Sequence, residues 1–237
     1  MDEALQLQAT VASSFAGRRN SPIVVLGAFG VAGKSAVQRL FESIEKQPKG
    51  GQIDLARQLH LLVREQTEEH RDARFKEVFG LSVMDVSGCQ MFQTDRYIEL
   101  LTSEAISKPG IWISSARIPG KQGEKFITEQ ILKCFNPGTI MLDLAMVEGG
   151  NVAYSKGDRT VFFNARTGLV EQTLESDGFF KSENWVEKME ECLLIRSVTG
   201  YPKRVPKEAS EAVSSATRYW ISDCVASAES TAVGAEE

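Results

Sequence analysis

The chain has 237 residues, with 27 Lys or Arg against 32 Asp or Glu, so its formal net charge is −5. Apolar residues make up 42% and charged residues 25% of the chain, which suits a globular protein with a sizeable core and excludes disorder over most of the length. An acidic chain with a pI near 5.3 argues against a nucleic-acid binder, because such proteins usually present a basic face.

The sequence shows no sign of a membrane span, since no apolar run approaches the ~20 residues that a transmembrane helix needs. The chain begins Met1-Asp2-Glu3, and acidic residues with no apolar run behind them argue against a secretory signal. We therefore expect a soluble protein of the cytoplasm or of an organelle matrix or stroma, with the compartment left open.

The cysteines and histidines indicate no metal site. No two cysteines form a CxxC pair, and a chain of this size does not need disulfides, so we expect reduced, buried thiols. His60 and His70 have no third ligand near them in the sequence, and we assign neither a metal-binding nor a catalytic role. The cysteines are Cys89, Cys134, Cys192 and Cys224.

The first elements are typical of a nucleotide-binding α/β unit. An N-terminal helical arm is expected over residues 1–20, where apolar side chains show helical spacing. Residues 23–26 form a β-branched run without alternation, which indicates a buried parallel strand. A glycine-rich loop follows, and residues 34–45 are predicted to be a helix. Strand, glycine loop and helix in this order open a nucleotide-binding unit.

Short strands and helices alternate along the rest of the first two thirds. This alternation predicts a Rossmann-like α/β domain over residues 21–163, with a doubly wound parallel sheet. Further strands are predicted at 59–63, 81–86, 110–115, 139–144 and 160–163, and further helices at 66–79, 94–106 and 128–135.

The alternation of short predicted strands and helices ends after residue 163. Residues 164–194 are interpreted as an inserted segment, and residues 195–222 as a closing region whose C-terminal helix covers 208–221. Residues 223–237 are rich in Ala, Ser and Glu and are expected to form a flexible tail.

The glycine loop fits the pattern GxxGxxG, one residue away from the dinucleotide-binding GxGxxG. In such loops the first glycine permits a tight turn and the second lets the backbone approach a pyrophosphate. The third lets helix and strand pack closely, and the helix N-terminus faces the anion. We predict that a dinucleotide contacts Gly27, Ala28, Gly30, Val31 and Gly33.

An acidic residue is expected after the second strand, where it would accept the adenosine ribose hydroxyls. Glu65 is the candidate, with Arg64 beside it. Because a carboxylate at this place would repel a 2′-phosphate, the cofactor is expected to be NAD(H) rather than NADP(H).

The same loop also has the ending of a phosphate loop, Gly33-Lys34-Ser35. Asp143 follows an apolar run and resembles a magnesium-binding Asp, although it equally suits an ordinary loop cap. A P-loop NTPase is therefore one alternative, and a loop that keeps its shape without a ligand is another. Ala28 stands where a phosphate loop has its first glycine, and the three-glycine spacing suits a dinucleotide better.

Residues 114–151 carry the most specific pattern of the chain. They read SSARIPGK at 114–121, FITE at 126–129, NPGTI at 136–140, LDLA at 142–145 and EGGN at 148–151. In order and spacing they closely resemble the nucleotide-binding half of the NAD(H)-binding component of proton-translocating NAD(P) transhydrogenase. Alanine dehydrogenases are a more distant match. The resemblance covers residues 23–163 and returns at 202–210.

This resemblance implies a Rossmann-like fold, NAD as cofactor, and a segment after the fourth strand that passes under the nicotinamide ribose. It assigns Ser115, Ala116 and Arg117 to that segment, with Arg117 where the family usually has Leu. Gly149 and Asn151 belong to the matching Gly-Gly-Asn stretch and are expected to bind the cofactor as well.

The departures from the family bear on catalysis. The family's catalytic half precedes the first strand and supplies an Arg-Gln-Asp loop, whereas this sequence has about 20 residues there. Val147 stands at the catalytic Asp of the alanine dehydrogenases, and Glu148 at the neighbouring Gln.

We therefore expect an NAD(H)-binding domain without catalytic residues. Its role would be that of an accessory or structural subunit, with protein subunits of a larger assembly as partners. The alternative is an NAD-dependent oxidoreductase component, of transhydrogenase or alanine dehydrogenase type, that another chain completes.

Overall fold

A computed structural model gives the fold, and all its described residues lie in one compact unit, Ala9–Thr199. The predicted N-terminal arm, the helices at 94–106 and 208–221, and the C-terminal tail lie outside the described residues. The described residues are 21–45, 56–64, 67–81, 89–93, 108–116, 125–145, 149–157, 159–175 and 188–197.

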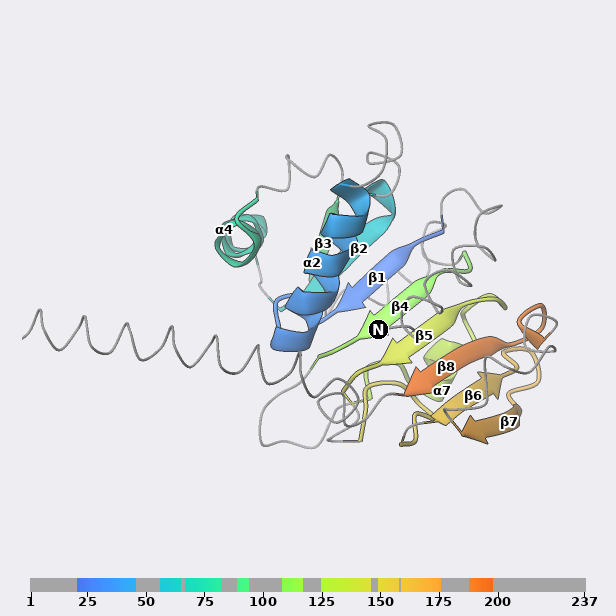
Figure 1. Cartoon of the computed structure of the whole chain (residues 1–237). Helices are drawn as coiled ribbons and strands as arrows, with labels where there is room; N and C mark the ends of the chain where they lie inside the picture. Colours follow the sequence, from blue (N-terminus) through green and yellow to red (C-terminus); the bar gives the residue numbers. More distant parts are fainter. Residues whose placement is uncertain are drawn as a thin grey trace, which may run out of the picture. The chain divides into compact units, whose positions relative to one another are not determined.

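The described strands form one eight-stranded sheet in the order β3-β2-β1-β4-β5-β8-β6-β7 (Figure 1). From β3 to β8 in this order all neighbours are parallel, whereas β6 runs antiparallel to both β8 and β7. The strands are β1 Ile23–Leu26, β2 Leu59–Val63, β3 Gln90–Gln93, β4 Ile111–Ser114, β5 Ile140–Asp143, β6 Arg159–Phe163, β7 Val170–Glu175 and β8 Leu193–Ser197.

The helices with defined bounds are α2 (Val31–Glu45), α4 (Glu68–Phe79) and α7 (Glu129–Leu132), and residues 56–58 before β2 are helical as well. Helix α4 begins after Thr67, whose side chain caps it by accepting a hydrogen bond from the His70 N–H at 3.2 Å. It ends at Gly80, whose φ of 70° closes the helix in the left-handed conformation.

Apolar side chains cover both faces of the sheet. Val25 of β1 packs in one cluster with Val37 of α2 and Phe75 of α4. The neighbouring residue Val24 points to the opposite face and joins a second cluster that includes Leu132 of α7. Helices therefore lie on both faces, and the predicted Rossmann-like α/β class is confirmed.

The structure differs from the predicted strands at three places. Of the strand predicted at 81–86, Leu81 lies in a bend and the rest is outside the described residues. The third described strand is Gln90–Gln93, which was not predicted. Its sequence QMFQ lacks the apolar run that marks a buried strand. Strand β7 lies within the predicted insertion, and β8 runs across the boundary predicted between residues 194 and 195. Within β8 the apolar run ends at Ile195, and the strand continues through Arg196 and Ser197, which are not typical of a buried strand.

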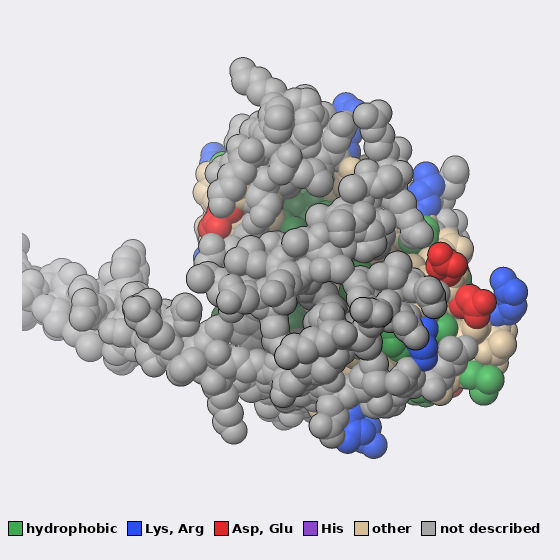
Figure 2. Space-filling model, turned by 45° about the vertical axis from the view of Figure 1, so that its right-hand side comes forward, with side chains coloured by type: hydrophobic (Ala, Val, Ile, Leu, Met, Phe, Trp, Pro, Cys, Tyr) green, Lys and Arg blue, Asp and Glu red, His purple; other side chains and the backbone are tan. Residues whose placement is uncertain are grey.

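The surface drawn in Figure 2 carries described side chains of both charge signs, with acidic and basic groups close together at the right of the view. Within the part of the chain that the structure describes, no helix is long and apolar enough to cross a membrane.

Candidate functional site

The candidate site lies at the carboxyl ends of β1 and β4, which are neighbours in the middle of the sheet. From β1 the chain goes on to β2 on one side, and from β4 it goes on to β5 on the other side. Open α/β sheets bind ligands at such a reversal point, outside the carboxyl ends of the strands. The Ser115 N–H donates to the Leu26 carbonyl at 3.0 Å and joins the two strand ends.

Two structural features require glycine at position 27, the first residue after β1. Its φ is +76°, a conformation that other L-residues rarely adopt. A Cβ at this position would also lie 2.8 Å from the Cα and N atoms of Ala116, the second residue after β4. The Gly27 carbonyl accepts a hydrogen bond from the Gly30 N–H at 2.9 Å, which closes the tight turn before α2.

Gly33, in the first turn of α2, packs directly on this turn. A Cβ here would lie 2.1 Å from the Gly27 carbonyl oxygen and 2.8 Å from Ser115 Oγ. Ser115 Oγ itself donates to the Leu26 carbonyl at 2.8 Å. The contact has the form expected of the third glycine in a dinucleotide loop, which brings the helix close to the strands.

Gly30 and Val31 lie on the outer side of the same turn. Gly30 is exposed, and a Cβ there would meet only the Gly27 carbonyl oxygen, at 3.2 Å. Val31, the first residue of α2, is 91% exposed. The first turn of α2 contains no acidic side chain, so no carboxylate of that turn competes for its backbone N–H groups. Such a helix start favours an anion.

Two predicted residues, Glu65 and Arg117, lie outside the described residues. Arg64, next to Glu65, is exposed directly after the end of β2. Of the residues predicted from the glycine loop and the segment after β4, the structure brings Gly27, Gly33, Ser115 and Ala116 into mutual contact. Ala28 is buried in the core beneath the turn.

The loop after β5 forms a second part of the site. Asp143, fully buried at the end of β5, accepts hydrogen bonds from the backbone N–H groups of Ala145, Asn151 and Val152 at 3.0, 2.8 and 2.9 Å. Asn151 is also buried, and its Oδ1 accepts a hydrogen bond from Ser114 Oγ at 3.1 Å. The side chain of Asn151 is therefore held against the end of β4.

Lys125 holds the same loop from the other side. Its ammonium donates to the carbonyls of Gly149 and Val152, the second at 3.0 Å. Partial burial lowers the pKa of the Lys125 amine, and the Asp143 carboxylate opposes that shift. Sequence reasoning missed Lys125, because its partners are backbone carbonyls more than 20 residues away in the chain. The cap role of Asp143 was one of two roles that its sequence position suggested.

The contacts do not favour the P-loop interpretation. Both carboxylate oxygens of Asp143 already accept backbone N–H groups, which makes this residue a loop anchor. Ser35 Oγ, the expected magnesium ligand of a phosphate loop, donates to the Val31 carbonyl at 3.1 Å. Among the residues of known placement, no three His, Cys, Asp or Glu side chains gather in a way that would hold a metal ion.

Comparison with known proteins gives a consistent result. The family model described as alanine dehydrogenase/PNT, C-terminal domain, matches residues 1–168. Over 116 residues the chain is 35% identical to the NAD(P) transhydrogenase subunit alpha of Haemophilus influenzae. That alignment covers 49% of this chain and 17% of the relative, so the chain spans less than a fifth of that protein's length.

One solved structure supports the same fold, and a second was also matched. An L-alanine dehydrogenase superposes with a TM-score of 0.51 at 16% identity, over 87% of this chain and 44% of that one. The transhydrogenase of Sinorhizobium meliloti gives a TM-score of 0.37 at 23% identity, over 58% of this chain and 32% of that one.

Proposed function

The chain belongs to the family of alanine dehydrogenase/PNT C-terminal domains, and from this premise we propose that it binds NAD(H) across the carboxyl ends of β1 and β4. The observation that carries the proposal is the packing of Gly27 against both Ala116 and Gly33. This packing joins the turn after β1, the start of α2 and the segment after β4 into one unit at the reversal point of the sheet. Dinucleotides bind at that place in Rossmann-like folds.

The strand order indicates on which side of the site the adenosine half and the nicotinamide half of the cofactor would lie. The pyrophosphate would lie on the exposed side of the turn at Gly30 and Val31, where the helix N-terminus favours an anion. The adenosine half would extend over the end of β2 toward Glu65, and the nicotinamide half over β4 and β5. On that side are Ser115 and Asn151.

We propose further that this chain is an accessory subunit of a larger assembly and does not transfer hydride by itself. Hydride transfer needs donor and acceptor held about 3–3.5 Å apart, and the dehydrogenase relatives add a proton-transferring acid. Val147 stands at the position of that acid and is unable to move a proton. The carboxylate of Asp143, four residues earlier in the sequence, is engaged by three backbone N–H groups.

Isothermal titration of the purified chain with NADH and with NADPH tests the binding proposal. We expect NADH to bind at one site per chain and NADPH to bind more weakly, because Glu65 would repel the 2′-phosphate. Tighter NADPH binding would overturn the Glu65 assignment, and no heat with either nucleotide would overturn the binding site. Native mass spectrometry of the particle isolated from its source tests the accessory role by the chains that come with it.

A further inference from the structure

The loop Gly149–Val152 is held by two ionisable groups, one bonded to its N–H groups and one bonded to its carbonyl groups. On the side of its N–H groups, the buried Asp143 carboxylate accepts from Asn151 and Val152. On the side of its carbonyl groups, the Lys125 ammonium donates to Gly149 and Val152. Val152 is the one residue of the loop that both groups contact. Hydrogen bonds to charged groups are roughly twice as strong as neutral ones, so this double hold keeps the loop in one place.

Lys125 also connects the two loops that border the nicotinamide side of the proposed cleft. It lies in the segment that leads from β4 to α7, two residues before Ile127. The Ile127 N–H donates to the Asn151 carbonyl at 3.0 Å, and the Ala153 N–H donates to the Ile127 carbonyl at 2.7 Å. This parallel bridge sets the two loops side by side, and Lys125 extends the connection to Gly149.

We propose that Lys125 is a positioning residue that fixes the Gly149–Val152 loop and thereby sets the affinity for the nicotinamide half of the dinucleotide. The hold of Lys125 on the loop does not depend on the proposed NAD(H) function. The effect on nucleotide affinity rests on that proposed function. Lys125 does not need to touch the cofactor, because it acts through Gly149 and through Asn151, whose side chain is held at the end of β4. Movement of this loop would leave the turn at Gly27 and Gly30 unchanged.

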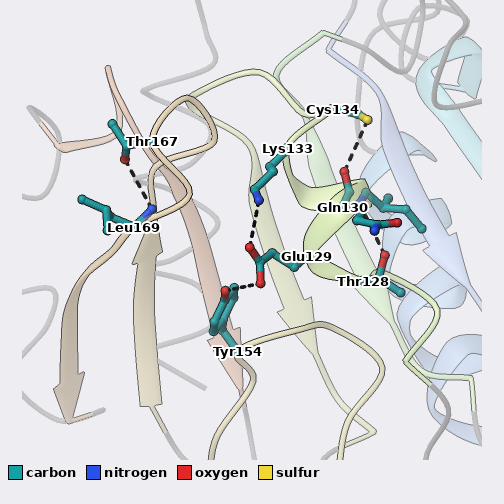
Figure 3. Close-up of polar contacts among 9 residues, drawn as sticks. Thr128, Glu129, Gln130, Lys133, Cys134, Tyr154, Thr167 and Leu169 are labelled. Carbon is teal, nitrogen blue, oxygen red and sulfur yellow. Dashed lines mark hydrogen bonds and ion pairs between the residues drawn. The ribbon is translucent and has the colours of Figure 1, made fainter.

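Lys133 offers a matched control on the same side of the molecule. It is exposed directly after α7, as the cap residue of that helix, and it pairs with Glu129 at 2.9 Å. The same carboxylate accepts a hydrogen bond from Tyr154 Oη at 2.7 Å (Figure 3). None of the three belongs to the Gly149–Val152 loop. Replacing this second lysine changes the net charge by the same amount as replacing Lys125.

The test compares Lys125→Met, Lys125→Arg and Lys133→Met with the parent chain. Methionine keeps a long unbranched stem and removes both charge and donors, whereas arginine keeps them. The first measurement is amide hydrogen exchange at Asn151 and Val152 without any nucleotide. We expect the fastest exchange in Lys125→Met, an exchange rate between that and the parental rate in Lys125→Arg, and the parental rate in Lys133→Met.

The second measurement is the affinity for NADH and for AMP, which carries only the adenosine half. We expect Lys125→Met to bind NADH about tenfold more weakly and AMP as tightly as the parent, because a charge-assisted contact is lost on one side only. Lys125→Arg should recover part of the NADH affinity. Lys133→Met should match the parent for both ligands.

Three results would overturn the inference: parental exchange and NADH affinity in Lys125→Met, an equal loss of NADH and AMP in that variant, or the same loss in Lys133→Met. A parent chain that binds neither nucleotide would instead overturn the proposed function. In that case the exchange rates still decide whether Lys125 holds the loop.

Discussion

The carbonyl oxygen of Gly27 occupies the place where any side chain on Gly33 would begin, since a Cβ on Gly33 would lie 2.1 Å from it. The turn that follows β1 and the first turn of α2 are therefore in backbone-to-backbone contact. Neither group can yield by a rotamer change, because the oxygen belongs to the main chain. The helix can approach the strand this closely only because Gly33 has no Cβ.

Gly33→Ala should therefore destabilise the chain strongly for so small a change. We expect a loss of roughly 3 kcal/mol in the free energy of unfolding, at the upper end of overpacking effects, together with loss of NADH binding. Urea unfolding measures the first and fluorescence titration the second. Gly30→Ala is the control, since its Cβ would be 3.2 Å from the same oxygen on the exposed side. Equal stability of the two variants would show that the helix does not press on the turn.

Gly30→Val should separate binding from folding. The valine side chain would extend from the exposed side of the turn, where the pyrophosphate is proposed to lie, and it would block the close approach of the backbone. We expect the unfolding free energy to change by about 1 kcal/mol, as at other helix N-caps, and NADH binding to be lost. If the variant binds NADH as well as the parent does, the pyrophosphate site is assigned wrongly.

Acid should destabilise the chain through His60. This side chain of β2 is 4% exposed, and burial lowers its pKa from 6.5 to about 4, against the effect of a hydrogen bond with Gln90. In the unfolded chain the imidazole takes up a proton below pH 6.5, whereas in the folded chain it stays neutral until about pH 4. Stability that is complete above pH 6.5 is therefore lost as the pH falls toward 4, by up to roughly 3 kcal/mol.

Urea unfolding at a series of pH values between 7.5 and 4.5 measures this effect. The loss on acidification should be smaller in His60→Leu than in the parent. His70→Gln is the matched control, because His70 is the other histidine of the chain and lies exposed in the first turn of α4. Parallel pH curves for the parent and His60→Leu would contradict the assignment.

The purified chain should show no hydride transfer of its own. We expect no transhydrogenation with a thionicotinamide analogue and no oxidation of alanine above a protein-free blank, because Val147 replaces the acid of the dehydrogenase relatives. Turnover that Gly30→Val abolishes would contradict the accessory role. That result would instead identify an oxidoreductase component that works with another chain.

Local sequence patterns predicted the parts of the fold that local physics determines. The run of residues 23–26 and the strand at 140–143 were predictable, because strands buried on both faces need continuous apolar side chains. Strand β8 was not predicted, and its charged residue Arg196 is not typical of a buried strand. In the sheet this side chain is 5% exposed, and its guanidinium donates to Thr160 Oγ1 at 3.3 Å across the antiparallel pair. That partner is 36 residues away, and no local signal reveals it.

In the candidate site, too, some features could be predicted from local sequence patterns and others depend on contacts between distant residues. The glycine spacing is local, so the turn at Gly27 and the packing of Gly33 could be anticipated from the sequence. The hold on the Gly149–Val152 loop depends on Asp143 and Lys125, and only the folded chain brings that lysine to its partners. Glu65 and Arg117 remain predictions from the sequence alone.

The place of β8 in the sheet has a consequence for how the chain acquires its structure during synthesis. β8 is the last of the described strands to leave the ribosome, yet it lies between β5 and β6 and pairs with both. The hairpin of β6 and β7 is synthesised earlier, and it has to wait for β8, its partner strand, until Ser197 has emerged. At about 5–20 residues per second this wait lasts seconds, during which two strand edges stay unpaired. A ribosome that stalls before Leu193 would leave the hairpin without its link to the parallel strands, as a target for quality control.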